Sequence, residues 1–152
     1  MVKVGDVFYI NTDKGRAYFQ YVKNIPRFSY VIRVFFGFYP DEGQQDVTEV
    51  VKSPVSFLIC FPLGAADRRR VVHKCGYVPL DEAARKIPVF RYGVPNPGTG
   101  KVRVWRLWDG EKEWSVENMT DEQRKLPLKI IVNDTALIAR IERGWTPEND
   151  PW

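Results

Sequence analysis

The segment from Tyr30 to Tyr39 constrains the fold of this chain more than any other stretch of its sequence. Apolar side chains recur at every second position, which is the period of a β-strand. One phase holds Tyr30, Ile32, Val34, Phe36 and Phe38, and the other holds Val31, Phe35 and Tyr39. Because both phases are apolar, the sequence predicts a central strand covered on both faces. We therefore expect Phe36 to be buried and Phe36→Ala to be among the most destabilising substitutions.

Seven other runs are predicted to be strands, because short apolar runs bounded by turn residues are typical of strands. They are Val7 to Ile10, Ala17 to Lys23, Val55 to Phe61, Val71 to Val78, Val89 to Tyr92, Val102 to Trp108 and Glu113 to Val116. Aromatic residues form 14% of the chain, and this excess also favours pleated, half-buried surfaces. Residues 95–100 are predicted to be a loop, because their prolines lack a backbone donor and their glycines weaken a strand.

The last third of the sequence predicts helix. Residues 120–123 have the form of a capping box, in which Thr120 and Gln123 satisfy each other's backbone N–H groups. A second helix is expected after Pro127, since apolar residues then follow at helical spacing. The residues at this spacing are Ile130, Ile131, Asp134, Leu137, Ile138 and Ile141, with Gly144 as the stop. The helix could instead begin later, with Asn133 or Asp134 as its N-cap.

Many strands followed by helices favour an α+β, mainly β domain, since no strand–helix alternation runs through the chain. We expect a twisted antiparallel sheet or a partly open barrel with one or two C-terminal helices. A short helical turn is also expected at Asp81. The chain of 152 residues is expected to form one domain, residues 1–152, without needing a disulfide or a metal to fold.

No part of the sequence predicts secretion or a membrane span. A charge and a turn signal follow Met1 too early for the apolar region of a signal peptide. The longest apolar run, from Phe57 to Leu63, is far shorter than the roughly 20 residues of a membrane-spanning helix. We therefore expect a cytoplasmic protein without a membrane partner, in which Cys60 and Cys75 stay reduced.

Residues able to perform catalysis are few. His73 is the one histidine, so a nucleophile–histidine site could be built only around it. Cys75 lies two positions away on the same strand face, and Cys60 could join them as a third metal ligand if its strand pairs with theirs. The other interpretation is a pair of core thiols beside a half-buried histidine. Because paired metal-ligand spacings and phosphate-binding loops are missing too, we expect no enzyme, no metal, no cofactor and no small-molecule substrate.

An acidic stretch with interspersed tryptophans is the first candidate for a partner-binding surface. Residues 109–122 hold six carboxylates against Lys112 alone, which gives a net charge of −5. Tryptophan is enriched at interface hot spots, and acidic patches steer basic partners. The candidate residues are Trp105, Trp108, Asp109, Glu111, Glu113, Trp114 and Glu117. The alternative is that the tryptophans belong to the core and that the acids lie on an ordinary solvated hairpin.

A basic run supports a second hypothesis, binding of nucleic acid. Arg68, Arg69, Arg70 and Lys74 could contact phosphates, and sheet aromatics such as Tyr77 could stack on bases. A run this short is more often a solvated loop, and basic and aromatic residues are poorly interleaved here. Nucleic acid is therefore kept as the alternative partner.

Three groups of residues near the two ends of the chain form a recognisable set. Val4 to Ile10 with Gly15 to Val22 look like a first hairpin, and Trp105 to Glu111 look like a late strand and turn. A closing helix is suggested by Leu126 to Leu128, Ala136 to Ile141, and Gly144 with Trp145. This set resembles immunity protein family 26 of bacterial polymorphic-toxin systems.

The resemblance implies a cytoplasmic inhibitor that binds and neutralises a cognate protein toxin, with no catalysis and no cofactor. It supplies no binding residues, because such modules diversify their contact surface. One feature departs from the pattern: inhibitors of basic nuclease toxins are often acidic, whereas this chain carries a net charge of +4. The acidic stretch at residues 109–122 is therefore the first place where contact with a toxin is expected.

Overall fold

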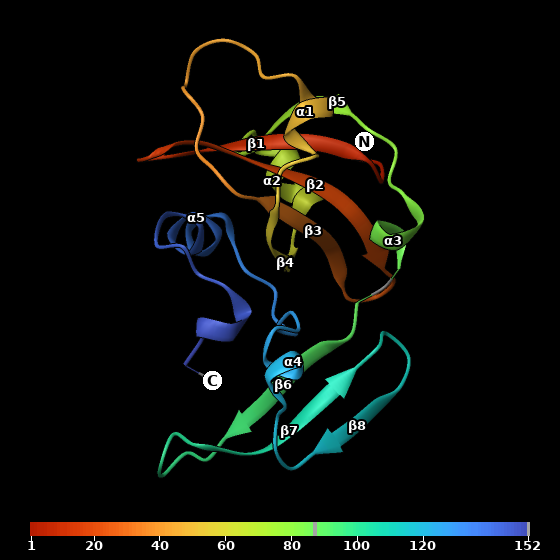
Figure 1. The fold of residues 1–152 in the computed structure, drawn as a ribbon, viewed down its shortest axis with the longest axis vertical. Helices are drawn as coiled ribbons and strands as arrows, with labels where there is room; N and C mark the ends of the chain where they lie inside the picture. The colour runs from red at the N-terminus through yellow and green to blue at the C-terminus, as the bar shows by residue number, and fades with distance from the viewer. Residues whose placement is uncertain (87, 152) are drawn as a thin grey trace.

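A computed structural model describes residues 1–86 and 88–151 of the chain, and its larger part is a five-stranded antiparallel sheet (Figure 1). Its strands lie in the order β4-β3-β2-β1-β5. Their bounds are Asp6–Thr12 for β1, Gly15–Ile25 for β2, Ser29–Phe35 for β3, Val55–Phe61 for β4 and His73–Tyr77 for β5. The predicted strands at these positions are confirmed, with one difference at the end of β3.

Strand β3 ends at Phe35, four residues before the predicted end. It lies between β2 and β4, and buried side chains cover both of its faces, as predicted. The next residues leave the ladder at Gly37, whose φ of 105° is a conformation that glycine adopts at little cost. Phe36 is consequently 53% exposed, so the expectation that it is buried is wrong. Tyr39 returns to the sheet through an isolated bridge to Arg16.

A second antiparallel sheet of three strands lies below the first in Figure 1. It has the order β6-β7-β8, with β6 at Phe90–Pro95, β7 at Val102–Trp108 and β8 at Glu113–Val116. The fold is therefore α+β and mainly β, as predicted, but its strands form two sheets, and neither closes into a barrel in the part of the chain described. Residues 96–101 form the loop between β6 and β7, so the loop predicted at residues 95–100 is confirmed except at Pro95, which ends β6 and pairs with Val102.

The extended segment 127–132 joins the edges of the two sheets. The N–H of Arg91 in β6 donates to the carbonyl of Pro127 at 2.9 Å, and the N–H of Lys129 donates back to the carbonyl of Arg91 at 2.9 Å. Further along, the N–H of Val132 donates to the carbonyl of Cys60 in β4 at 3.1 Å. These backbone bonds occupy residues that were expected to start a helix after Pro127, so the early start of that helix is wrong.

The C-terminal helix α5 instead spans Asp134–Glu142. Its N-cap is Asn133, whose side chain accepts from the N–H of Ala136 at 2.8 Å, so the later of the two predicted starts is confirmed. The capping box is confirmed as well: it begins helix α4, which spans Asp121–Arg124, with reciprocal bonds of 3.1 Å and 2.9 Å between Thr120 and Gln123.

The remaining helices are short. They are α1 at Val47–Val50, α2 at Leu63–Arg68, the predicted turn α3 at Glu82–Arg85, and a 3-10 turn at Pro147–Asn149.

Three clusters of buried side chains hold these layers together. The largest lies between one face of the five-stranded sheet and α5, and includes Phe19 and Leu137. A second cluster packs Phe90 of the small sheet against Val31 and Cys60 of the large one. A third lies under α1 on the other face of the large sheet. None of the helices in residues 1–86 and 88–151 is both long and apolar enough to cross a membrane.

Candidate functional site

The three tryptophans of the predicted partner-binding surface do not share one face of the small sheet. In the register of β7 and β8, Trp108 pairs with Glu113, Leu107 pairs with Trp114, and Trp105 pairs with Val116. Directly paired residues project to the same face, and successive residues of a strand alternate. Trp105 and Trp114 therefore lie on one face and Trp108 on the other.

Trp108 belongs to the packing between the two sheets. Its ring centre lies 5.1 Å from that of Phe28 and 5.7 Å from that of Phe90, and the ammonium of Lys129 lies 4.2 Å from it. For this tryptophan the interpretation as a core residue is correct. Trp114, by contrast, is 41% exposed, and Trp105 is half-buried with the guanidinium of Arg91 5.1 Å from its ring centre.

Two of the predicted acidic contacts are already engaged within the chain. Asp109 accepts from the N–H groups of Glu111 at 2.9 Å and Lys112 at 2.7 Å, which closes the turn between β7 and β8 and lowers the pKa of its carboxyl. Glu113 lies 3.3 Å from the guanidinium of Arg106 and 3.6 Å from the ammonium of Lys129. The predicted site thus reduces to Trp105, Trp114, Glu111 and Glu117, the last two being exposed.

A hydrogen bond from Tyr92 is the largest cause that lowers the pKa of Glu113, and the neighbouring cations act in the same direction. Its carboxylate is therefore held ionised and partnered, which leaves less negative charge to attract a basic partner. The net charge of −5 that the sequence gives to residues 109–122 overstates the acidity of this surface.

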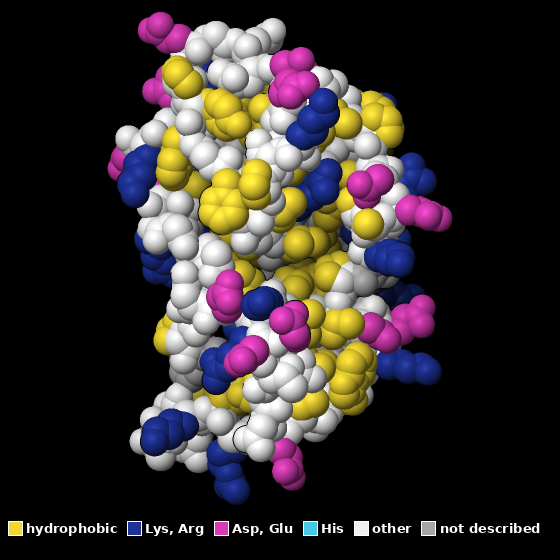
Figure 2. Space-filling model, in the orientation of Figure 1, with side chains coloured by type: hydrophobic (Ala, Val, Ile, Leu, Met, Phe, Trp, Pro, Cys, Tyr) yellow, Lys and Arg dark blue, Asp and Glu magenta, His cyan; other side chains and the backbone are white. Residues whose placement is uncertain are grey.

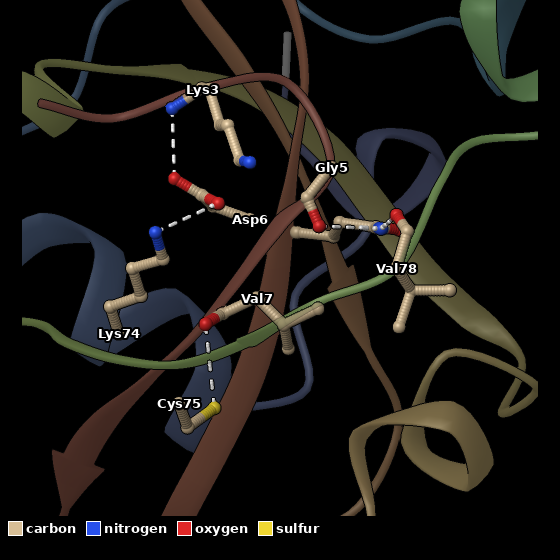
Figure 3. Close-up of polar contacts among 8 residues, drawn as sticks. Lys3, Gly5, Asp6, Val7, Lys74, Cys75 and Val78 are labelled. Atoms are coloured by element: carbon tan, nitrogen blue, oxygen red, sulfur yellow. Dashed lines mark hydrogen bonds and ion pairs between the residues drawn. The ribbon is translucent and has the colours of Figure 1, made fainter.

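The basic residues of the alternative hypothesis are exposed, but two of the four face carboxylates. A guanidinium nitrogen of Arg69 lies 3.8 Å from Asp134, and the ammonium of Lys74 lies 3.1 Å from the buried carboxylate of Asp6 (Figure 3). Arg68 ends helix α2, and Arg70 follows with a positive φ of 59°. The positive charge open to a phosphate is therefore centred on Arg68 and Arg70.

The structure separates Cys60 from the other two predicted metal ligands. Cys60 lies in β4 and His73 and Cys75 lie in β5, which are the opposite edges of the large sheet. The expectation that the three could converge is wrong, and no group of three potential metal-binding side chains occurs among the residues described. His73 instead pairs with Tyr9 across the β1–β5 ladder.

Neither thiol is placed to act as a nucleophile at neutral pH. Burial raises the pKa of Cys60 to about 12 and that of Cys75 to about 11. The thiol of Cys75 donates to the carbonyl of Val7 at 3.4 Å (Figure 3). Since the thiolate is the reactive form, both cysteines have the inert, structural character of buried thiols.

An aromatic groove that the sequence did not predict lies where β3 ends beside α5. Phe36 and Phe38, 53% and 40% exposed, border a cavity of about 320 Å³ whose inner wall includes Phe57 and Trp145. The rings of Phe57 and Trp145 meet edge to face at 5.1 Å. Figure 2 shows hydrophobic side chains gathered on this face, over the segment that leaves β3. We call this set of four aromatic residues and its cavity the aromatic groove.

The rim of the aromatic groove is mostly basic. The side chains of Lys14, Arg140 and Arg143 line it together with one acid, Glu142. The β1–β2 turn fixes one wall, because the N–H of Asp13 donates to the carboxylate of Glu142 at 2.7 Å and the ammonium of Lys14 donates to its carbonyl at 2.6 Å. Gly37 between the two phenylalanines was the available sequence signal, since glycine weakens a strand interior.

Searches of this chain against known protein-family models, curated proteins and solved structures found no match. The resemblance to immunity protein family 26 therefore stays a prediction.

Proposed function

We propose that this chain is a non-catalytic protein-binding module of the immunity type, which neutralises a protein toxin by covering part of its surface. The observation that carries the proposal is the aromatic groove, where Phe36 and Phe38 stand exposed just after the end of β3 and border a cavity. Single exposed apolar residues are ordinary, but an apolar patch with a polar rim is typical of a protein-binding surface. The resemblance in sequence supports the same function.

The chemistry of the groove favours a partner segment that combines apolar and acidic side chains. An apolar side chain would enter the cavity between Phe36, Phe38 and Trp145, where it would be removed from water. Carboxylates beside it would face the basic rim formed by Lys14 and Arg143. The basic character of this rim also suits the net charge of +4 better than an acidic inhibitor surface does.

A second contact surface is proposed at the edge of the small sheet, around the half-buried Trp105 and the exposed Trp114. Trp114 offers an exposed indole, and Glu111 and Glu117 lie near the same hairpin. Hot-spot residues are often large aromatics set among contacts of little energetic weight. A substitution at Trp114 changes this surface and leaves the aromatic groove intact, so it will separate the contributions of the two surfaces to binding.

The proposal predicts that a neighbouring gene encodes a toxin domain, and the test is co-expression with that gene's product, followed by co-purification and a growth assay. We expect a complex and protection of the cells. Phe36→Ser combined with Phe38→Ser should weaken binding by at least about tenfold, as expected for hot-spot aromatics. Val94→Ser is the matched control, because Val94 is 70% exposed and lies outside the groove. Failure to bind or protect against that toxin would remove the proposal.

Trp114→Ser separates the two surfaces in the same assay. If Trp114→Ser loses binding and the double phenylalanine variant does not, the toxin contacts the small sheet and not the aromatic groove. Equal binding by both variants and the wild-type chain would exclude both surfaces.

Binding of nucleic acid remains the alternative proposal, supported by the exposed Arg68 and Arg70. Phosphate contacts weaken steeply with salt, with a log–log slope of about −0.7 to −0.9 per contact. If this is the function, replacing Arg68, Arg69 and Arg70 by glutamate should abolish salt-dependent binding to single-stranded DNA or RNA. Absence of such binding in the wild-type chain would end the alternative.

A further inference from the structure

A second cavity, of about 330 Å³, lies beside the β1–β5 edge of the large sheet. Strands β1, β2 and β5 supply Tyr9, Arg16, Tyr18, His73 and Cys75, and the loop before α1 closes it with residues 43–45. Its volume is within the range of small-molecule sites. At about 30 Å³ for each water in the liquid, the cavity has room for roughly ten non-hydrogen atoms.

Arg16 presents a guanidinium in this cavity that is only partly satisfied by the protein. Its central carbon lies 4.1 Å from the ring centre of Tyr9, and Nη1 donates to the carbonyl of Gly43 across 3.3 Å. The Nε atom is buried and has no hydrogen-bond partner among the described residues. A buried donor without an acceptor is costly, so a rotation of the Arg16 side chain that brings Nε to an acceptor in the cavity would be favourable.

The other side chains add positive charge or neutral donors. The imidazole of His73 lies 4.9 Å from the ring of Tyr9, which therefore touches both His73 and Arg16. Burial raises the pKa of Tyr18 and Cys75, so both groups stay protonated and neutral at physiological pH. Lys74 also lines the cavity, but its ammonium pairs with Asp6 (Figure 3).

The charged side chains that line the cavity are positive. Arg16 and Lys74 are cations, and the lining residues described include no carboxylate. Arginine presents a planar fork of N–H donors that matches the oxygens of phosphate, and the aromatic ring beneath it holds that fork in place. Gln44 and Gln45 on the loop can donate from their side-chain amides.

We propose that this cavity binds a small phosphomonoester, with the phosphoryl group on Arg16 and the organic part against Tyr9 and the 43–45 loop. The site is separate from the aromatic groove, and the inference does not depend on the proposed function. It assigns to the chain a small-molecule ligand rather than a substrate, since the two thiols and the single histidine provide no activated nucleophile.

The test is a titration of the ¹⁵N-labelled protein with glycerol 1-phosphate, followed by amide chemical shifts at constant ionic strength. Saturable shifts are expected at Arg16, Gln45 and His73, and none are expected with glycerol alone. Arg16→Gln should weaken binding by at least about tenfold, because it removes a charge-assisted, bidentate contact. Arg103→Gln is the matched control, since Arg103 is an exposed arginine of β7 that does not line the cavity.

Further variants keep the test decisive if Arg16→Gln does not fold. Arg16→Lys retains the charge without the fork and should bind more weakly than the wild-type chain, and His73→Gln should do the same. Inorganic phosphate should compete for the same amides. Shifts that do not saturate, that are matched by glycerol, or that persist unchanged in the Arg16 and His73 variants would overturn the proposal.

Discussion

The ammonium of Lys74 lies 3.1 Å from a carboxylate oxygen of Asp6, whose side chain is fully buried (Figure 3). The second oxygen of that carboxylate accepts from the N–H of Lys3 at 2.8 Å. Asp6 begins β1, and Lys74 lies in the edge strand β5, so the ion pair ties the edge of the large sheet to its neighbour. A buried charge is tolerated only with such partners, which makes this pair a structural contact.

Removing the ammonium should therefore destabilise the fold. We expect Lys74→Met to lower the free energy of unfolding by about 1–3 kcal/mol, because a buried carboxylate would lose a charged partner. Lys52→Met is the control, since Lys52 pairs with Glu49 on the surface at the same 3.1 Å, with both side chains about 70% exposed. That change should cost less than about 1 kcal/mol. Urea unfolding of the two variants measures the difference, and equal losses would contradict the role given to Asp6.

Two adjacent phenylalanines offer a sharper test of where β3 ends. Phe35 is 2% exposed and packs under α1, whereas Phe36 is 53% exposed. Phe35→Ala should lower the free energy of unfolding by about 3–5 kcal/mol, as truncation of a buried ring does. Phe36→Ala should change it by less than about 1 kcal/mol. A reversed order in denaturant unfolding would restore the strand that the sequence predicted through residue 39.

This pair also indicates how far the sequence could predict the fold. Short apolar runs located each strand of residues 1–86 and 88–151, and alternation identified β3 as covered on both faces, because the side-chain pattern is set by which face of the backbone meets the core. Alternation does not specify where a ladder stops, and the apolar pattern continued to Phe38 after Gly37 had turned the chain away. The way the two sheets are joined depends on the backbone bonds of residues 127–132, which side-chain periodicity does not encode.

The tryptophans of the small sheet provide a second matched pair. Trp108 is partly buried and packs against Phe28 and Phe90, so Trp108→Ala should lower the free energy of unfolding by about 2–3 kcal/mol. Trp114→Ala should cost much less, because its indole is 41% exposed on the opposite face. Thermal and urea unfolding will separate the two. A large loss for Trp114 with a small loss for Trp108 would show that the register of β7 and β8 is wrong.

The candidate site was less predictable than the fold for the same physical reason. The sequence placed three tryptophans close together, but strand register decides which face each one occupies. The sequence also placed acids beside them, but it did not show that two cations pair with Glu113. Arg106 does so from the adjacent strand β7, and Lys129 does so from the segment that joins the two sheets. The aromatic groove brings Phe36 and Phe38 together with Phe57 and Trp145, which are about 20 and 110 positions beyond the end of β3, and such long-range contacts leave no local pattern.

The buried thiols give a prediction about pH. Folding raises the pKa of Cys75 from 9.0 to about 11 and that of Cys60 to about 12, through burial. The folded chain therefore holds these protons to higher pH than the unfolded chain does. Their contribution to stability is complete below pH 9 and is lost as the pH rises through 11 to 12, with Tyr18 and Tyr21, whose pKa values are also raised, acting in the same direction.

The pH dependence of alkylation by iodoacetamide reports this shift for the half-buried Cys75, because the thiolate is the reacting form, whereas the fully buried Cys60 reacts only when the fold opens. At about pH 8, we expect native Cys75 and Cys60 to react far more slowly than the same thiols in urea, where their pKa values return to about 9. Cys75→Ala leaves Cys60 alone, so its slower profile can be followed by itself, and Cys60→Ala does the same for Cys75. Native Cys75 that reacted at its unfolded rate near neutral pH would show that its pKa is not raised, and it would reopen the possibility of a thiolate beside His73.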